Sequence, residues 1–416
     1  MLNVNNFITE NKGTDGNIRQ SNADFFVDEV PLQLPSGEGP NTWLHIEKDG
    51  RTTLDVVLDI ARHLHLSRKR TGFAGMKDRS AITRQWLCIS NITPNELPNF
   101  NEILHNVKIL EIKQNQKKLR MGQLAGNKFK INIRNTNNPV EDKEIAEEVL
   151  ESLKITGVPN YYGYQRFGEV RSTTHLVGKC LVEGDIKKAV DTYIGNPNSE
   201  EHNIPYEARK LYDEGKLEEA YKIMPKSMRY EKSMIKELII SKQKHDELVE
   251  KDYIRAIESL PKPLKRMFVN AYESYLFNKI VNERSKIGIN KYYDGDIIID
   301  SQEHWIHEIN EENIQEDIDN FNLNPTAPLL GSKVPLAEGI QGEIEEKVIR
   351  EENIQKESFA CPKTPKLGSH GIRRSVRFKI EDTNVEQIDD GISVEFFIPR
   401  GCYATAVLRE IMKKNV

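Results

Sequence analysis

The stretch TGFAGMKDRSAITRQWLCIS, residues 71–90, is the part of the chain that determines most of what its sequence predicts. It begins with two glycines three residues apart, Gly72 and Gly75, which permit a tight turn or a close approach of two backbones. It ends in the run Trp86–Ser90, whose apolar residues are typical of a short, largely buried strand. The pattern therefore predicts a glycine-kinked loop that leads into a strand of a sheet. Before this stretch, Thr52 or Thr53 can cap a helix with one apolar face.

This loop carries a carboxylate between two cations, because Asp78 stands between Lys77 and Arg79. Nearby positive charge favours the ionised form of a carboxyl group. Such a triplet occurs most often as a solvated charge cluster on a turn, and the local chemistry leaves that interpretation open. The other interpretation is a catalytic carboxylate that is kept negative and exposed.

The spacing of the loop resembles a known signature. The residues that carry the resemblance are Gly75, Lys77, Asp78, Ala81, Thr83 and Gln85, in the pattern A-G-x-K-D-x-x-A-x-T-x-Q. This pattern is similar to that of the TruD family of tRNA pseudouridine synthases. The resemblance implies that Asp78 is the catalytic residue.

The chain of 416 residues is long enough for roughly two to three domains. Its net charge of −5 at first argues against a nucleic-acid partner, because phosphate binding relies on Lys and Arg. The charges are segregated, however, with basic blocks at 62–84, 113–134 and 363–379 and acidic ones at 308–319 and 338–357. Each basic block alone is typical of solvated surface. Three blocks together, one of them holding Asp78, favour a polyanionic substrate.

The cysteines and histidines predict no metal site. The four cysteines are far apart and form no C-x-x-C pair, which suits a reducing compartment. His304 and His307 could meet on a helix turn, but no third ligand accompanies them. The N-terminus is polar and no apolar run is long enough to span a bilayer. We therefore expect a cytoplasmic protein with no membrane partner.

A second informative segment is VPNYYGYQRFG, residues 158–168, which sets aromatic rings among Asn160, Gln165 and Arg166. An enzyme that acts on a base within RNA must take the base out of the stack, and an aromatic ring is a natural surface on which to hold it. An ordinary aromatic core segment has the same composition, so the residues alone leave both interpretations open.

The same segment resembles the N-Y-F-G-x-Q-R-F-G motif of the TruD family. The resemblance implies that Tyr162, at the position of the family's phenylalanine, packs on the target base, although its hydroxyl adds a hydrogen-bonding group. It also implies that Asn160 helps to orient the loop of Asp78. Arg19 stands where the family usually has a basic residue, most often lysine, that pairs with the catalytic carboxylate.

Near the C-terminus, LGSHGIRRSVRFK, residues 367–379, places Arg373 and Arg374 side by side after two glycines. Adjacent arginines suit phosphate contacts. We expect Arg373, Arg374 and Arg166 to bind RNA. In the family this segment marks the return of the chain to the catalytic domain.

The composition changes between these motifs. Residues 179–260 are rich in Lys, Glu and Tyr with helical spacing. Lys265–Glu283 is the strongest helix prediction, with one apolar side formed by Phe268, Ala271, Tyr272, Tyr275, Leu276 and Ile280. The resemblance implies a catalytic domain formed by 1–178 and 371–416. It also implies an inserted TRUD domain, 179–370, whose residues 179–260 form a mainly helical extension, as in archaeal or eukaryotic-type members.

The resemblance covers the chain from about Arg19 to Lys413 and implies an α+β protein. The implied architecture is the pseudouridine synthase catalytic fold, a mixed, largely antiparallel sheet flanked by helices, with an inserted α/β TRUD domain. One strand of such a sheet is predicted at Lys128–Arg134, where apolar residues alternate with Lys128, Lys130 and Arg134. Its outward face is expected to be a basic ladder.

The implied reaction converts uridine to pseudouridine in tRNA, at position 13 in the D arm. It breaks the C1′–N1 bond, rotates the base and rejoins it through C5, so it requires no cofactor and no metal. An ionised Asp78 could act as a nucleophile at C1′ or as a base at the 2′ proton. Lys77, Arg79 and Arg19 are expected to promote its ionisation. We expect tRNA as the partner, and a monomeric enzyme.

Two other classes of function stay open. One is a non-catalytic protein that binds structured RNA and retains the fold, in which case replacing Asp78 would leave its function unchanged. The other is a different carboxylate enzyme that acts on nucleotides. A glycosidase, however, needs a second carboxylate near the first, and a phosphatase needs a metal or a phosphate cradle. No motif supplies either.

Overall fold

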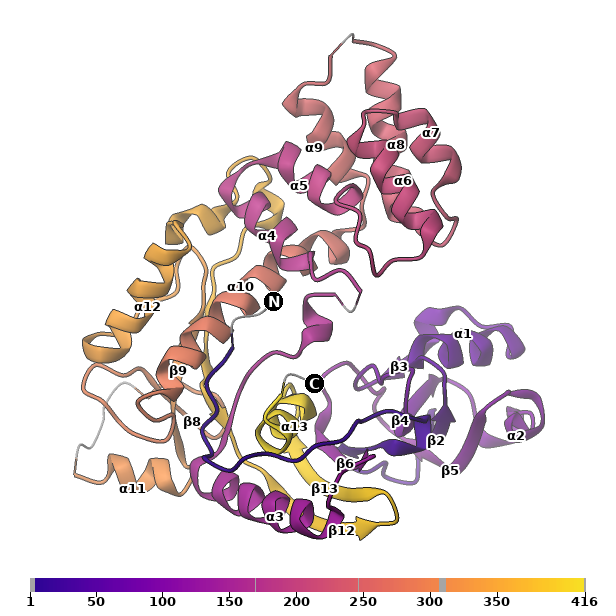
Figure 1. The fold of residues 1–416 in the computed structure, drawn as a ribbon. Helices are drawn as coiled ribbons and strands as arrows, with labels where there is room; N and C mark the ends of the chain where they lie inside the picture. The colour runs from indigo at the N-terminus through magenta and orange to yellow at the C-terminus, as the bar shows by residue number, and fades with distance from the viewer. Residues whose placement is uncertain (1–3, 169, 246, 307–311, 415–416) are drawn as a thin grey trace. The chain divides into compact units, whose positions relative to one another are not determined.

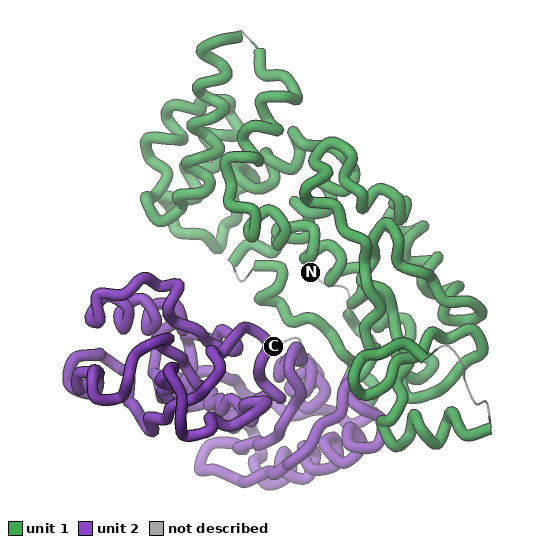
Figure 2. Tube along the Cα trace, turned by 180° about the vertical axis from the view of Figure 1, so that it is seen from behind, with its two compact units in different colours: residues 1–8, 159–377 green, residues 9–158, 378–416 purple. Residues whose placement is uncertain are grey.

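The computed structural model describes residues 4–168, 170–245, 247–306 and 312–414. The chain forms two compact units (Figures 1 and 2). Unit 1 comprises Met1–Ile8 and Pro159–Arg377, and unit 2 comprises Thr9–Val158 and Phe378–Val416. Each unit is therefore built from segments that are far apart in the sequence.

Unit 2 is organised around an eight-stranded sheet. Its strands are β1 (Phe25–Pro31), β2 (Asn41–Asp49), β3 (Thr71–Phe73), β4 (Ile82–Ser90), β5 (Val107–Asn115), β6 (Leu124–Arg134), β12 (Glu381–Ile388) and β13 (Gly391–Pro399). The order is β12-β13-β6-β1-β4-β2-β5, and β3 pairs with β4. β1 and β4 run parallel, and the other pairs are antiparallel. This mixed, largely antiparallel sheet confirms the predicted fold class.

Among its described residues, unit 2 has four α-helices: α1 (Thr53–His63), α2 (Phe100–Ile103), α3 (Pro139–Thr156) and α13 (Ala404–Met412). α1 begins where the hydroxyl of Thr52 accepts a hydrogen bond from the amide of Asp55, an N-cap that the sequence predicted. Its residues Val57 and Ile60 are buried in a cluster with Leu44 of β2. The helix therefore covers the sheet beside the strand that follows Asp78.

The glycine prediction at the start of the quoted stretch is confirmed at Gly72. A Cβ atom there would lie 2.2 Å from the carbonyl oxygen of Leu119, so only glycine lets these two backbones approach. β3 can then pair with β4, with Gly72 opposite Cys88.

The outward face of β6 differs from the free basic ladder that the sequence predicted. Ile131 and Ile133 are buried, as expected. The cations on the other face meet acids: Lys128 lies 2.9 Å from Asp382, Lys130 lies 2.7 Å from Glu395 and Arg134 lies 2.7 Å from Asp390. These acids come from the C-terminal segment of the chain, which supplies β12 and the neighbouring strand β13.

Unit 1 is mainly helical. Its helices are α4 (Thr174–Glu183), α5 (Ile186–Ile194), α6 (Asn203–Asp213), α7 (Leu217–Ile223), α8 (Arg229–Lys242), α9 (Glu250–Glu258), α10 (Lys262–Ser285), α11 (Ile314–Asp319) and α12 (Gly339–Glu351). A three-stranded sheet has the order β10-β9-β8, with β8 at Ile298–Asp300, β9 at Leu323–Leu329 and β10 at Ile372–Ser375. The short strands β7 (Val158–Pro159) and β11 (Arg377–Phe378) span two of the points at which the chain passes between the units.

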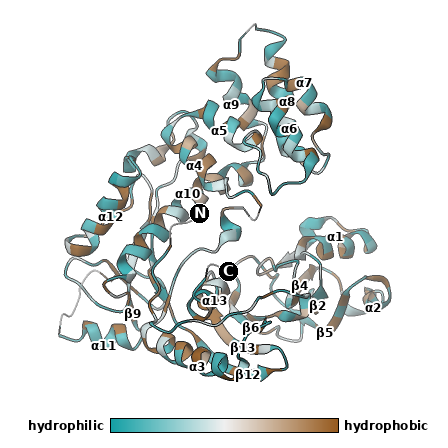
Figure 3. Ribbon diagram, in the orientation of Figure 1, coloured by the Kyte–Doolittle hydropathy of each residue, from teal (hydrophilic) through white to brown (hydrophobic). Residues whose placement is uncertain are grey.

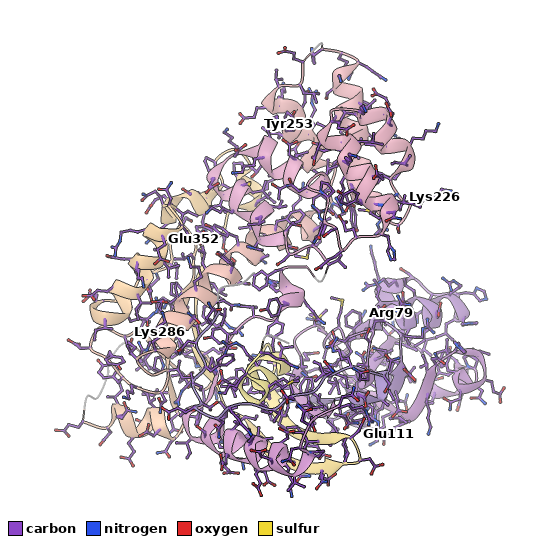
Figure 4. All side chains as sticks on the ribbon, in the orientation of Figure 1. Arg79, Glu111, Lys226, Tyr253, Lys286 and Glu352 are labelled. Atoms are coloured by element: carbon purple, nitrogen blue, oxygen red, sulfur yellow. The ribbon has the colours of Figure 1, made fainter. Side chains whose placement is uncertain are left out.

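The long helix α10 is central to unit 1. Phe268, Tyr272, Leu276 and Ile280 are all buried in one cluster, as the sequence predicted for this helix. Glu352, just after α12 (labelled in Figure 4), lies 2.9 Å from Lys179 of α4 and 3.0 Å from Lys279 of α10. The helices of both units carry hydrophilic as well as hydrophobic residues (Figure 3).

The limits of the units differ from the predicted domain limits, 178/179 and 370/371. Residues 159–178 belong to unit 1 because α4 packs closely on α10: a Cβ atom at Gly178 would lie 2.0 Å from the carbonyl oxygen of Phe268. The first residues belong to it because the amides of Asn5 and Asn6 donate to Oδ1 of Asn282. Among the described residues, no helix has the length and apolar composition needed to cross a bilayer.

Candidate active site

Asp78 lies in unit 2 on the loop that joins β3 to β4. Its Oδ2 accepts a hydrogen bond from Nη2 of Arg19 at 2.9 Å. The guanidinium of Arg19 also lies over the ring of Phe25, 4.2 Å from its centroid. These two contacts hold the cation in place, while 36% of the Asp78 side chain stays exposed. The structure thus presents a carboxylate that is paired on one side and open on another.

Lys77 points away from Asp78. Its Nζ lies 2.7 Å from Oε2 of Glu29 on β1, and the two side chains are only 6% and 0% exposed. The same ammonium donates to Oδ1 of Asn127 on β6 at 2.8 Å. Burial raises the pKa of the Glu29 carboxyl, and the charge of Lys77 opposes this shift. Lys77 is therefore paired with residues of β1 and β6. Arg79, the other neighbour of Asp78 in the sequence, is exposed (Figure 4).

Side chains from neighbouring elements hold the backbone of the loop. Nε2 of Gln85 donates to the carbonyl of Gly75 at 3.1 Å. The hydroxyl of Thr53 accepts a hydrogen bond from the amide of Lys77 at 2.9 Å and donates to Oε1 of Gln85 at 2.7 Å. The position of the loop is therefore fixed by α1 and β4 together.

Lys48 of β2 completes this support. Its Nζ donates to the carbonyl of Asp78 at 2.7 Å and also to the carbonyl of Arg51. The residue is fully buried, and burial lowers the pKa of Lys48 to about 8, against the opposing charge of Asp78. One buried ammonium thus holds the main chain of the candidate catalytic residue itself.

The other predicted residues form a second group, in unit 1. The amide nitrogen of the Asn160 side chain donates to the carbonyl of Ser375 at 2.9 Å, and its Oδ1 accepts from Nη2 of Arg374 at 2.6 Å. Asn160 therefore fixes the direction of Arg374. The predicted role of Asn160 in orienting the loop of Asp78 stays a prediction.

The backbone of Tyr162 is fixed by hydrogen bonds, and its ring lies among aromatic and guanidinium groups. Asn278 of α10 binds both the amide and the carbonyl of Tyr162, at 2.8 and 2.9 Å. The guanidinium of Arg374 lies 4.5 Å from the ring centroid, and Phe277 meets the ring edge-on. Arg166 lies 5.7 Å from the same centroid and donates to the hydroxyl of Ser274. An aromatic ring and two guanidiniums therefore form one cluster.

Arg373 departs from its predicted role in RNA binding. Its side chain has no exposed surface and pairs with Glu345 of α12 through two hydrogen bonds of 2.9 and 3.0 Å. The guanidinium also donates to the carbonyl and the hydroxyl of Thr326. A buried cation that is paired in this way is not available to a phosphate, so we assign Arg373 a structural role.

Metal ligands are not grouped within the described ranges, where no cluster of three or more His, Cys, Asp or Glu side chains is placed to hold an ion. His304 lies beside Asp300 at 3.2 Å. His307, the other histidine considered above, lies outside the described residues.

Sequence reasoning assigned no role in the site to several residues that hold it. Glu29 and Lys48 are charged residues inside apolar strands, and this placement was the available signal, because a buried charge needs a partner. Thr53 was considered only as a helix cap. Glu273 stands on the apolar face of α10 and is described below.

The sheet, with an ion-paired aspartate on the loop before one of its central strands, defines the class of protein as one with the pseudouridine synthase fold. The match to a family model is more specific. The chain belongs to the family described as tRNA pseudouridine synthase D (TruD), whose model matches residues 1–411.

Individual relatives agree with this assignment over nearly the whole chain. A tRNA pseudouridine synthase D from Syntrophotalea carbinolica is 32% identical over 405 residues, which cover 97% of this chain and 98% of the relative. One from Geobacter metallireducens is 33% identical and covers 96% of each chain. A crystal structure from Methanosarcina mazei, described as TruD, has a TM-score of 0.81 at 32% identity and covers 100% of this chain and 97% of that one.

Proposed function

We propose that this chain isomerises uridine to pseudouridine in tRNA and that Asp78 is its catalytic residue. Membership of the TruD family supports the reaction and the substrate class. The assignment of the residue rests on the Asp78 carboxylate itself: it is partly exposed, paired with Arg19 at 2.9 Å and carried by a loop that Lys48, Thr53 and Gln85 hold. A carboxylate fixed in this way can meet a ribose without reorganising.

The reaction begins when the glycosidic C1′–N1 bond breaks and its electron pair stays on the uracil ring. Asp78 assists by attacking C1′ or by accepting the 2′ proton, and both routes use the carboxylate in its ionised form, with Arg19 as its hydrogen-bond donor. The detached ring turns so that C5 faces C1′. The new C5–C1′ bond then forms as the Asp78–C1′ bond breaks or, on the second route, as Asp78 returns its proton to C2′. C5 then loses its proton, and N1 gains one. The balance is an isomerisation, so no electrons and no co-reactant enter.

In this proposal the cluster of unit 1 holds the displaced base. The ring of Tyr162 offers a stacking surface, and Arg374, which Asn160 orients, lies 4.5 Å from the centre of that ring. Aromatic rings and guanidinium planes are the usual partners of bases that leave the stack of an RNA. Arg166 and Arg374 supply positive charge for the backbone phosphates.

We further propose that the target is the uridine at position 13, in the D arm. The test uses two tRNA transcripts, one with cytidine at position 13 and one with cytidine at another uridine of the D arm. Pseudouridine formation should be lost in the first and retained in the second. Formation at an unchanged rate in the first transcript would contradict the assignment of the position, although not that of the reaction.

A further inference from the structure

A cavity of about 520 Å³ opens on one side of α10, and all of its lining residues belong to unit 1. Its buried floor contains Glu273, Ser274 and Leu367. The volume lies within the range of about 300–1,000 Å³ that is typical of sites for small ligands. The proposed reaction uses none of these three residues, so it does not explain why a glutamate is buried here.

Glu273 is the unusual feature of the cavity. Only 6% of the residue is exposed, and its Oε1 has no hydrogen-bond partner among the described residues. Burial raises the pKa of the Glu273 carboxyl to about 7, although a hydrogen bond with Ser369 and the charge of Arg166 oppose this shift. A buried acceptor without a partner is costly to a folded protein, unless a ligand supplies the missing hydrogen bond.

The loop that faces Glu273 is held firmly. The amide of Ser369 donates to the carbonyl of Phe359 at 2.8 Å, and the amides of Ser332 and Lys333 donate to the carbonyls of Ser369 and His370. Gly371 has a φ of 76°, and its amide donates to the hydroxyl of Ser369. The cavity therefore has a fixed wall opposite α10, which suits a preformed binding site.

The remaining walls combine apolar and cationic groups. Tyr162, Leu329 and Ile372 supply flat or apolar surface, and Arg166, Arg266 and His370 lie around them. Arg266 and His370 are exposed. An apolar slot with one acceptor at its floor and guanidiniums beside it matches a nucleotide, whose base needs the slot and whose phosphate needs the cations.

We propose that this cavity binds a second nucleotide of the RNA substrate, adjacent to the uridine that is isomerised, and that it selects a base with an exocyclic amino group. The inference rests on the proposed function, because Tyr162, which that function assigns to the target base, also lines this cavity. A nucleotide bound here therefore lies next to the target.

The choice of base follows from the free acceptor. Adenine, cytosine and guanine each present an amino group that can donate to Oε1 of Glu273. At the position of the amino group of adenine or cytosine, uracil presents a carbonyl oxygen, which cannot donate a hydrogen bond to the ionised carboxylate. The reacting uracil must also turn during the reaction, so a site that grips one edge of a base suits a neighbour better than the target.

The test is a set of short RNAs that contain one target uridine, in which each of the two nucleotides on either side is changed in turn to A, C, G or U. For the wild type we expect one position at which U raises KM by about tenfold relative to the preferred amino-bearing base, with kcat unchanged. Glu273→Leu should abolish this preference. Glu273→Gln should keep most of it, because its carbonyl oxygen is still an acceptor.

Two further variants separate base recognition from charge. Glu258→Leu removes an acidic residue from the exposed side of α9 and should leave the preference intact. Arg266→Gln should weaken binding of all the RNAs by a similar factor and lower its salt dependence, as expected for a phosphate contact. The proposal would be overturned if Glu273→Leu kept the base preference unchanged. It would also be overturned if U at that position lowered kcat of the wild type instead of raising KM.

The affinities of the same RNAs, measured at fixed salt, keep this proposal separate from the proposed function. If the wild type forms no pseudouridine, the proposed function fails, while a base preference in binding that Glu273→Leu removes still supports the cavity as a base site. If free nucleoside monophosphates compete for Glu273-dependent binding as well as the RNA does, the cavity serves a free nucleotide and the RNA proposal fails.

Discussion

Two buried glutamates, one in each unit, show how differently this chain uses a carboxyl group removed from water. Glu29 of β1 has the ammonium of Lys77 at 2.7 Å, whereas Glu273 of α10 hydrogen-bonds with Ser369, lines a cavity and has one oxygen without a partner among the described residues. Burial raises the pKa of both groups. The first is paired within the protein and holds a loop in place. The second retains an unused acceptor, which is the property of a site for a ligand.

The largest effect is expected from breaking the pair beneath Asp78. Lys77→Met leaves the charge of Glu29 buried without its cation and should lower the free energy of unfolding by about 3–5 kcal/mol. Urea denaturation at pH 7 measures the change. In the double variant Glu29→Gln/Lys77→Met much of the loss should be recovered, because no buried charge remains. Equal losses in the single and double variants would show that the ion pair is not the cause.

Removing the charge of Glu273 should raise the free energy of unfolding, whereas Lys77→Met should lower it. Its folded pKa of about 7 lies above the ordinary value of 4.5, so the wild type loses stability as pH rises through about 7. Glu273→Gln does not titrate and should be more stable than the wild type above pH 7, by on the order of 3 kcal/mol, with a smaller difference at pH 5.

Denaturation at pH 5 and pH 8 and at constant ionic strength tests this prediction. The groups that face Glu273 are Arg166, Arg266, His370 and Cys361. Burial raises the pKa of the Cys361 thiol to about 11, outside this range. The same comparison is repeated in a His370→Gln background, in which this histidine cannot contribute to the pH dependence. A difference that does not change with pH would contradict the assignment of the titration to Glu273.

Lys48 tests whether the support beneath Asp78 positions the catalytic group. Lys48→Met removes the hydrogen bond to the carbonyl of Asp78 and should lower kcat about 100-fold, with KM nearly unchanged, because a small displacement of a catalytic group is costly. Lys113→Met, at a half-exposed lysine of β5, is the matched control and should have little effect. A rise in KM at constant kcat would argue against positioning.

The smallest effect is expected at Tyr162. The contacts with Arg374 and Phe277 involve its ring, so Tyr162→Phe should change kcat/KM by less than about threefold, or under 1 kcal/mol. Tyr162→Ala should weaken the substrate contact by about 1–3 kcal/mol, the usual value of stacking on one base. Steady-state kinetics on one tRNA transcript compares the two. A large loss in Tyr162→Phe would show that the hydroxyl takes part.

The sequence predicted the features that depend on short spacings. The strand β4, the Thr52 cap and the buried face of α10 follow from local periodicity and were found as expected. The α+β class rested on a resemblance that spans the chain, and the sheet agrees with it. The separation of the predicted site residues into two units was not predicted.

Side-chain direction was the main property that the sequence could not provide. Arg373 and Arg374 are neighbours on β10, so they point to opposite faces: one is buried against Glu345 and the other reaches Asn160. Lys77 adjoins Asp78 in the sequence but pairs with Glu29, which lies on another strand. Likewise, the acids that neutralise β6 come from residues far along the chain. Such partners are set by tertiary packing.

The most direct test of the account is tritium release from C5-labelled uridine in an unmodified tRNA transcript, with the wild type, Asp78→Asn and the exposed control Asp389→Asn. We expect release by the wild type and the control, and a loss of at least about 1,000-fold in Asp78→Asn with tRNA affinity retained. Equal release by Asp78→Asn would contradict the catalytic role of Asp78. Tight binding with no release by any of the three would leave a protein that binds structured RNA without modifying it.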